Sequence, residues 1–145
     1  MKIIGFNLTK ILVERQENSM QDVKIDQNID IKNISEEKIP ITNKKTLKIE
    51  FNLSINYSNN FGKVEFKGNI LVIPEGNEFN ELLDLWKENK IPENIRVPLF
   101  NFIMNKCNVK ALYLEDELSL PYHMPMPRIA SKTQKENSTP KKNSE

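Results

Sequence analysis

The chain of 145 residues carries 21 basic and 20 acidic side chains, so its formal net charge is only +1, and this even mixture argues against a nucleic-acid-binding surface. The single cysteine excludes an internal disulfide and favours a reducing compartment, while the longest apolar run, Ile70–Ile73, is far too short to span a bilayer. No secretory leader pattern opens the sequence, so we expect a soluble, cytoplasmic, single-domain protein.

The first part of the chain predicts two strands. Over residues 2–13 apolar side chains alternate and then change phase, in the order Ile4, Phe6, Leu8, Ile11 and Val13. A change of phase within one strand predicts a β-bulge near Thr9–Lys10. Residues 23–31 alternate in the same way, although the polar Gln27 interrupts the apolar series. We therefore expect a second strand there.

Residues 47–57 carry the clearest pattern in the sequence. Apolar side chains occupy six successive odd positions, namely Leu47, Ile49, Phe51, Leu53, Ile55 and Tyr57. This period of two predicts one long strand with a single buried face. An Asn/Gly-rich turn follows at 58–62, and the alternation resumes over 64–72 with Gly68 at an inward position, which predicts an antiparallel hairpin. Residues 70–73 are apolar on both faces, so we expect the second face to be covered there.

A short helix is predicted after the hairpin. Asn77 can cap it, and Phe79, Leu82, Leu83 and Trp86 recur at helical spacing up to an end near Asn89. Because Trp86 is in register with the other three apolar residues, we interpret it as a core residue rather than a binding residue.

A second, longer helix is predicted to begin at Pro98, which suits a first helical turn. One apolar stripe comprises Leu99, Phe100, Ile103, Met104, Cys107, Ala111 and Leu114, and a second, roughly opposite, comprises Phe102, Val109 and Tyr113. A helix that only covers a sheet needs one stripe. The second stripe contacts either another copy of the chain, as an oligomer interface, or the segment 14–46 folded over it.

The chain then changes character. Three prolines within residues 118–127 predict an extended ribbon, and the composition of residues 130–145 predicts a disordered tail. From Arg128 onward the sequence contains five basic and two acidic side chains, so this end has a formal charge of +3 and the rest of the chain −2.

The residues that could carry chemistry are few. His123 is the only histidine and lies in the ribbon, while Cys107 lies on the apolar stripe, where an inert thiol is expected. Asp22, Asp26 and Asp30 are interpreted as a solvated strand edge rather than a cation site. The run Glu115–Glu117 is an acidic patch that either holds a basic partner or simply faces water. We expect no enzyme, metal or cofactor; an enzyme would need a concave polar pocket.

Three segments in this order carry a family resemblance: Phe79–Leu83, Val97–Ile103 and Leu118–Pro121, the last reading Leu-Ser-Leu-Pro. Together with the order of strands and helices, they resemble the SecB chaperone family, and more closely its smaller SecB-like relatives, over about residues 3–129. The resemblance implies an α+β fold, in which a four-stranded antiparallel sheet carries two helices packed on one face. It implies a single domain over residues 1–129 and assembly as a homotetramer, a dimer of dimers.

The resemblance also implies a function in protein transport: an ATP-independent holdase that binds unfolded or precursor polypeptides in apolar grooves. The candidate client-binding residues are Phe6, Phe61, Tyr122, Met124 and Met126, and each is equally compatible with ordinary packing. The tail lacks the Cys/His zinc pattern of bacterial members and the body is only mildly acidic, which puts docking to a translocation motor in doubt. The alternative is an interaction module that holds one specific partner, such as an antitoxin or an assembly subunit.

Overall fold

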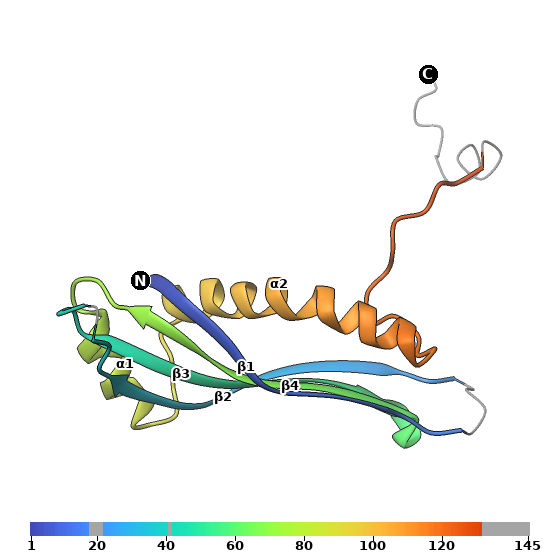
Figure 1. Ribbon diagram of the computed structural model, residues 1–145, viewed down its shortest axis with the longest axis horizontal. Coiled ribbons are helices and arrows are strands. Elements are labelled where there is room, and N and C mark those ends of the chain that lie inside the picture. The colour runs from blue at the N-terminus through green and yellow to red at the C-terminus, as the bar shows by residue number, and fades with distance from the viewer. Residues whose placement is uncertain (18–21, 41, 132–145) are drawn as a thin grey trace.

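The computed structural model describes residues 1–17, 22–40 and 42–131. The elements are β1 (Lys2–Arg15), β2 (Ile25–Glu37), β3 (Thr46–Tyr57), β4 (Gly62–Ile73), α1 (Glu78–Trp86) and α2 (Glu93–Glu117). The strands form one antiparallel sheet in the order β1-β4-β3-β2 (Figure 1). The predicted α+β fold with a four-stranded sheet and two helices is confirmed. No helix in the described residues is long and apolar enough to cross a bilayer.

The predicted hairpin is β3 paired with β4, from Leu47 opposite Val72 to Tyr57 opposite Gly62. A turn of 3-10 helix at Ser58–Asn60 joins the strands, and Asn59 and Asn60 adopt φ of 60° and 56°. Asparagine tolerates this left-handed region better than most residues, which explains the composition of the turn.

The edge strands are less regular than the hairpin. In β1 the register shifts between Leu8 and Lys10, which confirms the predicted bulge. A second shift between Ile3 and Gly5, which we did not predict, leaves Ile4 exposed and brings Ile3 opposite Val72. In β2 the register shifts between Ile31 and Asn33, and the strand continues to Glu37, beyond its predicted end at 31.

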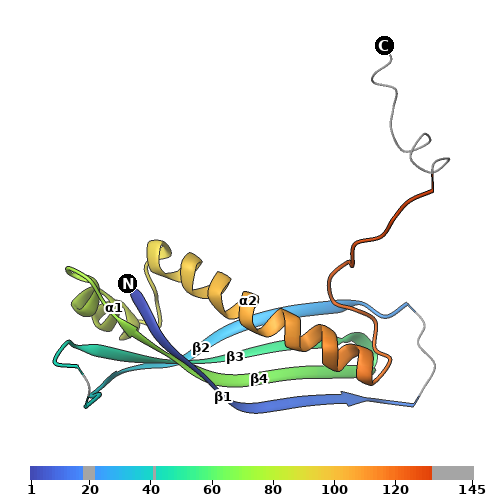
Figure 2. The ribbon, with the colours of Figure 1, turned by 45° about the horizontal axis from the view of Figure 1, so that its top comes forward.

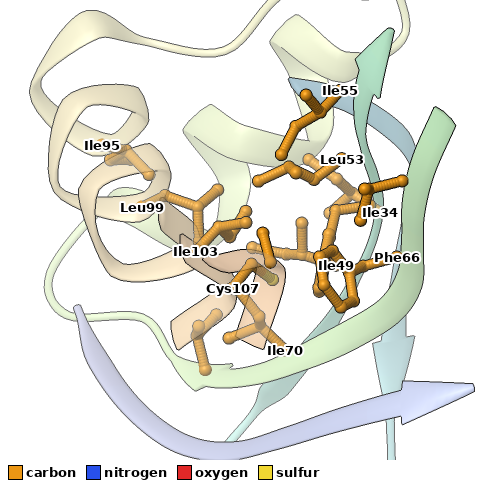
Figure 3. Packing of buried hydrophobic residues seen from close by; sticks show 14 of the residues in the cluster. Ile34, Ile49, Leu53, Ile55, Phe66, Ile70, Ile95, Leu99, Ile103 and Cys107 are labelled. Carbon is orange, nitrogen blue, oxygen red and sulfur yellow. The ribbon is translucent and has the colours of Figure 1, made fainter. Parts of the chain in front are cut away.

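One hydrophobic core lies between the sheet and the helices. Helix α2 crosses one face of the sheet (Figure 2), and its buried stripe consists of Ile95, Leu99, Ile103, Cys107 and Ala111. These side chains belong to the same cluster as Ile49, Leu53, Phe66 and Ile70 from the sheet (Figure 3). Leu82 of α1 joins the cluster and is fully buried. Each fully buried Leu, Ile or Phe side chain of this cluster contributes about 1.5–3 kcal/mol through removal from water.

The start of α2 differs from the sequence prediction. The helix begins at Glu93, not at Pro98, which lies inside it. The backbone N–H groups of Ile95 and Arg96 donate to the Pro92 carbonyl at 3.0 and 2.8 Å, so the first turn is already formed there. Pro98 is exposed, and water can hydrate the Asn94 carbonyl that lacks a donor. The earlier start adds Ile95 to the buried stripe.

The segment 14–46 does not cover α2, so that alternative is wrong for its described residues. Most of it forms β2 within the sheet, and Val109 and Tyr113 remain 70% and 65% exposed on α2. On the opposite face of the sheet, Leu71 and Ile73 stay half-buried, and Leu71 lies over Gly5, where an added Cβ would approach it to 3.3 Å.

Candidate functional site

A hollow of about 580 Å³ opens between β2, the connection from α1 to α2, and the first turns of α2. The connection and the start of α2 lie toward the end of the molecule at which α1 packs against β2 (Figure 1). We call the hollow the β2 groove. It is lined by Ile29, Asp30, Ile31, Lys32, Trp86, Asn89, Lys90, Ile91, Arg96 and Phe100.

The first wall of the β2 groove is a sheet edge. Within the described residues β2 pairs with β3 alone, so its other side presents backbone N–H and C=O groups without a strand partner. Ile29 and Ile31 pair with Leu53 and Phe51 and are half-buried. Lys32 is the extra residue of the bulge, and a bulge re-aims its side chain and interrupts pairing. This wall therefore offers apolar side chains, a free backbone and one cation.

The second wall is set by the turn that ends α1. Asn89 adopts φ of 59°, and its N–H donates to the Trp86 carbonyl at 2.8 Å. The N–H of Lys90 donates to the Leu85 carbonyl at 3.0 Å. A left-handed residue with these two bonds is a common way to terminate a helix. The turn places Lys90 and Ile91 against the groove.

The floor of the groove is aromatic. Trp86 and Phe100 are half-buried: both pack against the core and both line the groove. Our interpretation of Trp86 as a core residue therefore describes only part of its surface. Flat aromatic side chains that are partly covered offer a large contact area at small entropic cost, which suits binding of apolar groups.

The charges around the groove are mostly positive. Lys32 lies 4.0 Å from Asp30, Lys90 lies 3.7 Å from Glu88, and Arg96 lies 4.0 Å from Glu93. Of the three carboxylates only Asp30 lines the groove. The lining residues therefore carry two positive charges in excess.

A buried polar network fixes the ribbon that follows α2. The backbone N–H of His123 donates to Glu115 Oε1 at 3.1 Å, and the ring Nδ1 lies 2.8 Å from Oε2. The ring Nε2 lies 3.0 Å from Asn108 Oδ1, which also accepts from Gln27 Nε2 at 3.0 Å. The side chains of His123 and Glu115 are both buried, with exposures of 2% and 0%. Gln27 interrupts the apolar pattern of β2 because it joins this network.

Tyr57 extends the network to the sheet by donating to the carbonyl of Pro121. Burial, together with the nearby negative charge of Glu115, raises the pKa of Tyr57 well above its usual range. Glu115 is thus not part of an acidic surface patch, which corrects the interpretation of residues 115–117. The helix continues to Glu117 and turns Glu115 inward, while Asp116 faces out and accepts from the Tyr122 hydroxyl at 2.8 Å.

The predicted client-binding residues do not form one surface. Phe6 is half-buried and stacks on Phe51. Tyr122 borders a separate, smaller pocket beside Asp116, while Met124 and Met126 are exposed on the ribbon. None of these residues lines the β2 groove.

Phe61 requires a correction. It is only 3% exposed, so the prediction that it lies in an exposed groove is wrong for the single chain. The turn after β3 folds its ring against Tyr57, and the guanidinium of Arg15 lies 5.3 Å from the ring centroid. These neighbours cover it.

The three residues of the second stripe on α2 also differ in their exposure to solvent. Phe102 is half-buried, with its ring edge-on to Phe6 at 5.8 Å, whereas Val109 and Tyr113 are exposed. Two of the three residues predicted as an oligomer interface are therefore free of contacts that would bury them within the described chain.

Cys107 is fully buried, and burial raises the pKa of its thiol to about 11. Among the residues that the structure describes, no three His, Cys, Asp or Glu side chains lie close enough together to hold a metal ion. Asp26 and Asp30 are exposed on β2.

Sequence reasoning missed the β2 groove because its residues are separated by up to 71 positions, from Ile29 to Phe100. A usable signal was present in β2 itself. Its isoleucines alternate with the charged side chains of Asp26, Asp30 and Lys32, and charged side chains are common on edge strands. Nothing local in the sequence indicates that Trp86 and Phe100 complete the same hollow.

Comparison with known proteins supports the fold. No protein-family model and no curated protein matches the sequence. Among solved structures, the chain is similar to a SecB-like chaperone, Rv1957 of Mycobacterium tuberculosis, in complex with a ChAD peptide from the Rv1956 HigA1 antitoxin. The TM-score is 0.52 at 11% sequence identity, and the match covers 89% of each chain. At this identity the likeness shows a SecB-like fold.

Proposed function

We propose that this chain is a SecB-like chaperone that holds unfolded or precursor polypeptides in the β2 groove without a nucleotide. The observation that carries the proposal is the groove itself, where an unpaired sheet edge runs beside half-buried Ile31, Trp86 and Phe100. An unfolded polypeptide offers extended backbone and apolar side chains, and this combination of edge and apolar floor can accept both. Holding requires no chemical step, so no side chain is assigned a catalytic role.

Assembly into a homo-oligomer in the cytoplasm belongs to the same proposal. The exposure of Val109 and Tyr113 on α2 supports it, because contact with a second copy would remove these side chains from water. Tyr122, Met124 and Met126 form additional exposed apolar surface near the end of α2 that clients or sister copies can use.

A second candidate function is a dedicated module that holds one partner. A solved structure with a similar fold contains a peptide from an antitoxin, which supports the binding of one specific partner as well as a holdase function. The two candidates predict different complexes: a holdase binds many unfolded chains weakly, while a module forms one stoichiometric complex. Purification of the chain from its own cells, followed by mass spectrometry at increasing salt, separates them.

The direct test uses the tryptophan in the groove. Trp86 is the only tryptophan of the chain, so its emission reports on groove occupancy. We expect a reduced, unfolded client without tryptophan to shift this emission to shorter wavelength and to aggregate more slowly in the presence of the chain, without ATP. Replacement Trp86→Ala should weaken the protection, whereas Lys67→Ala on the opposite sheet face should not.

An unchanged Trp86 emission together with unimpeded client aggregation at several-fold excess of the chain would refute the holdase proposal. Unfolding curves of both variants check that each retains the fold, since Trp86 also packs against the core.

A further inference from the structure

We propose that the β2 groove selects extended segments in which carboxylate side chains lie next to apolar ones. This inference deepens the proposed function and rests on it. Three cations from three separate elements converge on the hollow: Lys32 from β2, Lys90 from the connection between the helices, and Arg96 from α2. They lie around the half-buried aromatic side chains of Trp86 and Phe100, and Asp30 and Asn89 are the other polar residues of the lining.

The carboxylates near these cations form only long and exposed ion pairs with them. Lys90 and Arg96 are paired at 3.7 and 4.0 Å with Glu88 and Glu93, neither of which lines the groove. The side chains of Glu88 and Glu93 are 66% and 80% exposed. Exposed pairs of this length contribute little and are screened by salt, so an incoming carboxylate can replace them without a large loss.

Lys32 also forms only a long, exposed ion pair, in this case with a residue of its own strand. Its contact is Asp30, two residues earlier on the same strand, at 4.0 Å and with both side chains more than half exposed. Asp30 lies opposite Asn52 in the ladder, whereas Lys32 is the unpaired residue of the bulge. The bulge therefore breaks the regular alternation that would place residues 30 and 32 side by side on the same face of the sheet. A ligand strand added to the edge of β2 would bring its own side chains beside Lys32.

The apolar floor determines what must accompany the carboxylates. Trp86, Phe100 and Ile31 are only half-buried, so an apolar ligand side chain placed on them removes further surface from water. Side chains of an extended segment alternate, which allows one set to reach the floor while the other set faces the cations at the rim. The favoured occupant is therefore an extended segment that alternates acidic and apolar residues.

The basic end of this chain has the wrong charge for the groove. From Arg128 onward it carries five basic and two acidic side chains. Like charges at the groove rim disfavour its binding, so this end does not compete with an acidic segment.

The test uses the full-length chain and three fluorescently labelled synthetic peptides. All three alternate Leu and Phe with one polar residue, which is Glu, Gln or Lys. We expect the Glu peptide to bind about tenfold more tightly than the Gln peptide, and the Lys peptide to bind most weakly, by fluorescence anisotropy at low salt. Raising the salt concentration should reduce the difference between the Glu and Gln peptides.

Charge-reversed variants locate the effect. Lys90→Glu combined with Arg96→Glu should reverse the order of the Glu and Lys peptides, because the groove rim then becomes acidic. A matched control, Lys67→Glu combined with Lys87→Glu, changes the net charge equally at exposed positions that do not line the groove, and should keep the order.

The outcomes distinguish this inference from the function on which it rests. Equal affinities for the three peptides, with no effect of charge reversal, would overturn the charge selectivity and leave the binding function standing. Failure of every peptide to bind would overturn both. Tighter binding of a single-stranded oligonucleotide, tested beside the peptides, would overturn the assignment of the groove to acidic polypeptides.

Discussion

At the scale of single residues, the most informative pair is His123 and Glu115. The two side chains are buried together, and Glu115 accepts from both the backbone and the ring of His123. Removing one member of a buried, hydrogen-bonded pair leaves the other without its partner in a place that water does not reach. This pair and the hydroxyl of Tyr57 hold the ribbon after α2, together with the buried side chain of Leu120.

We expect His123→Ala to lower the free energy of unfolding by about 3 kcal/mol, because Glu115 would lose its buried partner. Met124→Ala, one position further along the ribbon and exposed, should lower it by less than about 0.5 kcal/mol. Urea unfolding of both variants measures the difference. Equal losses would show that the pair does not anchor the ribbon.

Glu65 is a second residue whose charge contributes to stability. It lies on the opposite face of the sheet from the core and is 7% exposed. The ammonium of Lys10, 2.9 Å from Glu65 Oε1, holds the pKa of this carboxyl below its ordinary value against the opposing effect of burial. The folded state therefore binds the Glu65 proton less readily than the unfolded state does.

This shift predicts a dependence of stability on pH. The contribution of Glu65 is present at pH values above its unfolded pKa of about 4.3, and is lost as the pH falls through its lower, folded pKa. Glu65→Gln should therefore cost about 1 kcal/mol at pH 7, and its stability should approach that of the unmodified chain under strongly acidic conditions. Thermal unfolding across this pH range checks the prediction, with the exposed Glu117→Gln as control. A constant difference at every pH would contradict it.

At the scale of the elements, the edge strand β1 depends on a close approach to β4. Leu8 pairs with Gly68 directly beside the bulge between Leu8 and Lys10. A Cβ built on Gly68 would lie 2.2 Å from the backbone oxygen of Asn7, a distance that requires the strands to move apart. Gly68 is required because there is no room for a side chain against the backbone of β1, and its backbone conformation does not require glycine.

Gly68→Ala should consequently destabilise the chain by about 3 kcal/mol or prevent its folding, because the obstacle is backbone rather than a movable side chain. Gly76→Ala is the matched control. Gly76 has φ of +57° but open space around its Cβ position, so it should cost only about 1 kcal/mol through backbone strain. Thermal unfolding compares the two. A smaller effect at Gly68 than at Gly76 would refute the close-approach argument.

At the scale of the whole molecule, the exposed stripe on α2 is the surface on which the proposed association of copies can be tested. Val109 and Tyr113 are large, apolar and exposed, and α2 already buries a different stripe against the sheet. A second copy would cover them if the proposed oligomer forms. Substitutions there should leave the fold of one copy intact, because neither side chain belongs to the core cluster.

We expect light scattering to give a multiple of 16.9 kDa for the unmodified chain, and a lower mass when Val109→Asp and Tyr113→Asp are combined, since burying a carboxylate without a partner opposes association. Asn94→Asp, at an exposed position in the first turns of α2, should keep the original mass. A monomeric mass for the unmodified chain would remove the proposed interface.

The hairpin and the two helices could be predicted because their evidence is local. Leu47 to Tyr57 alternate without exception, and the residues from Phe79 to Trp86 follow a helical repeat, so each pattern is complete within one element. The start of α2 was misplaced because Pro98 resembles a first-turn residue, while the actual first turn depends on the Pro92 carbonyl. The second bulge of β1, near Ile4, left no visible change of phase.

The sequence by itself determined the strands, the hairpin and the helices, since side-chain periodicity within a segment decides which of its faces is buried. The SecB-like arrangement of these elements was implied by the resemblance of three short segments, and the similarity to a solved structure supports it. Only the tertiary structure decided which side chains of separate elements share a site. Ile31 and Phe100 line the same groove, and His123 of the ribbon lies against Glu115 of α2. Such contacts depend on how α2 is laid across the sheet and on where the chain turns back, and neither is encoded in the pattern of any single segment.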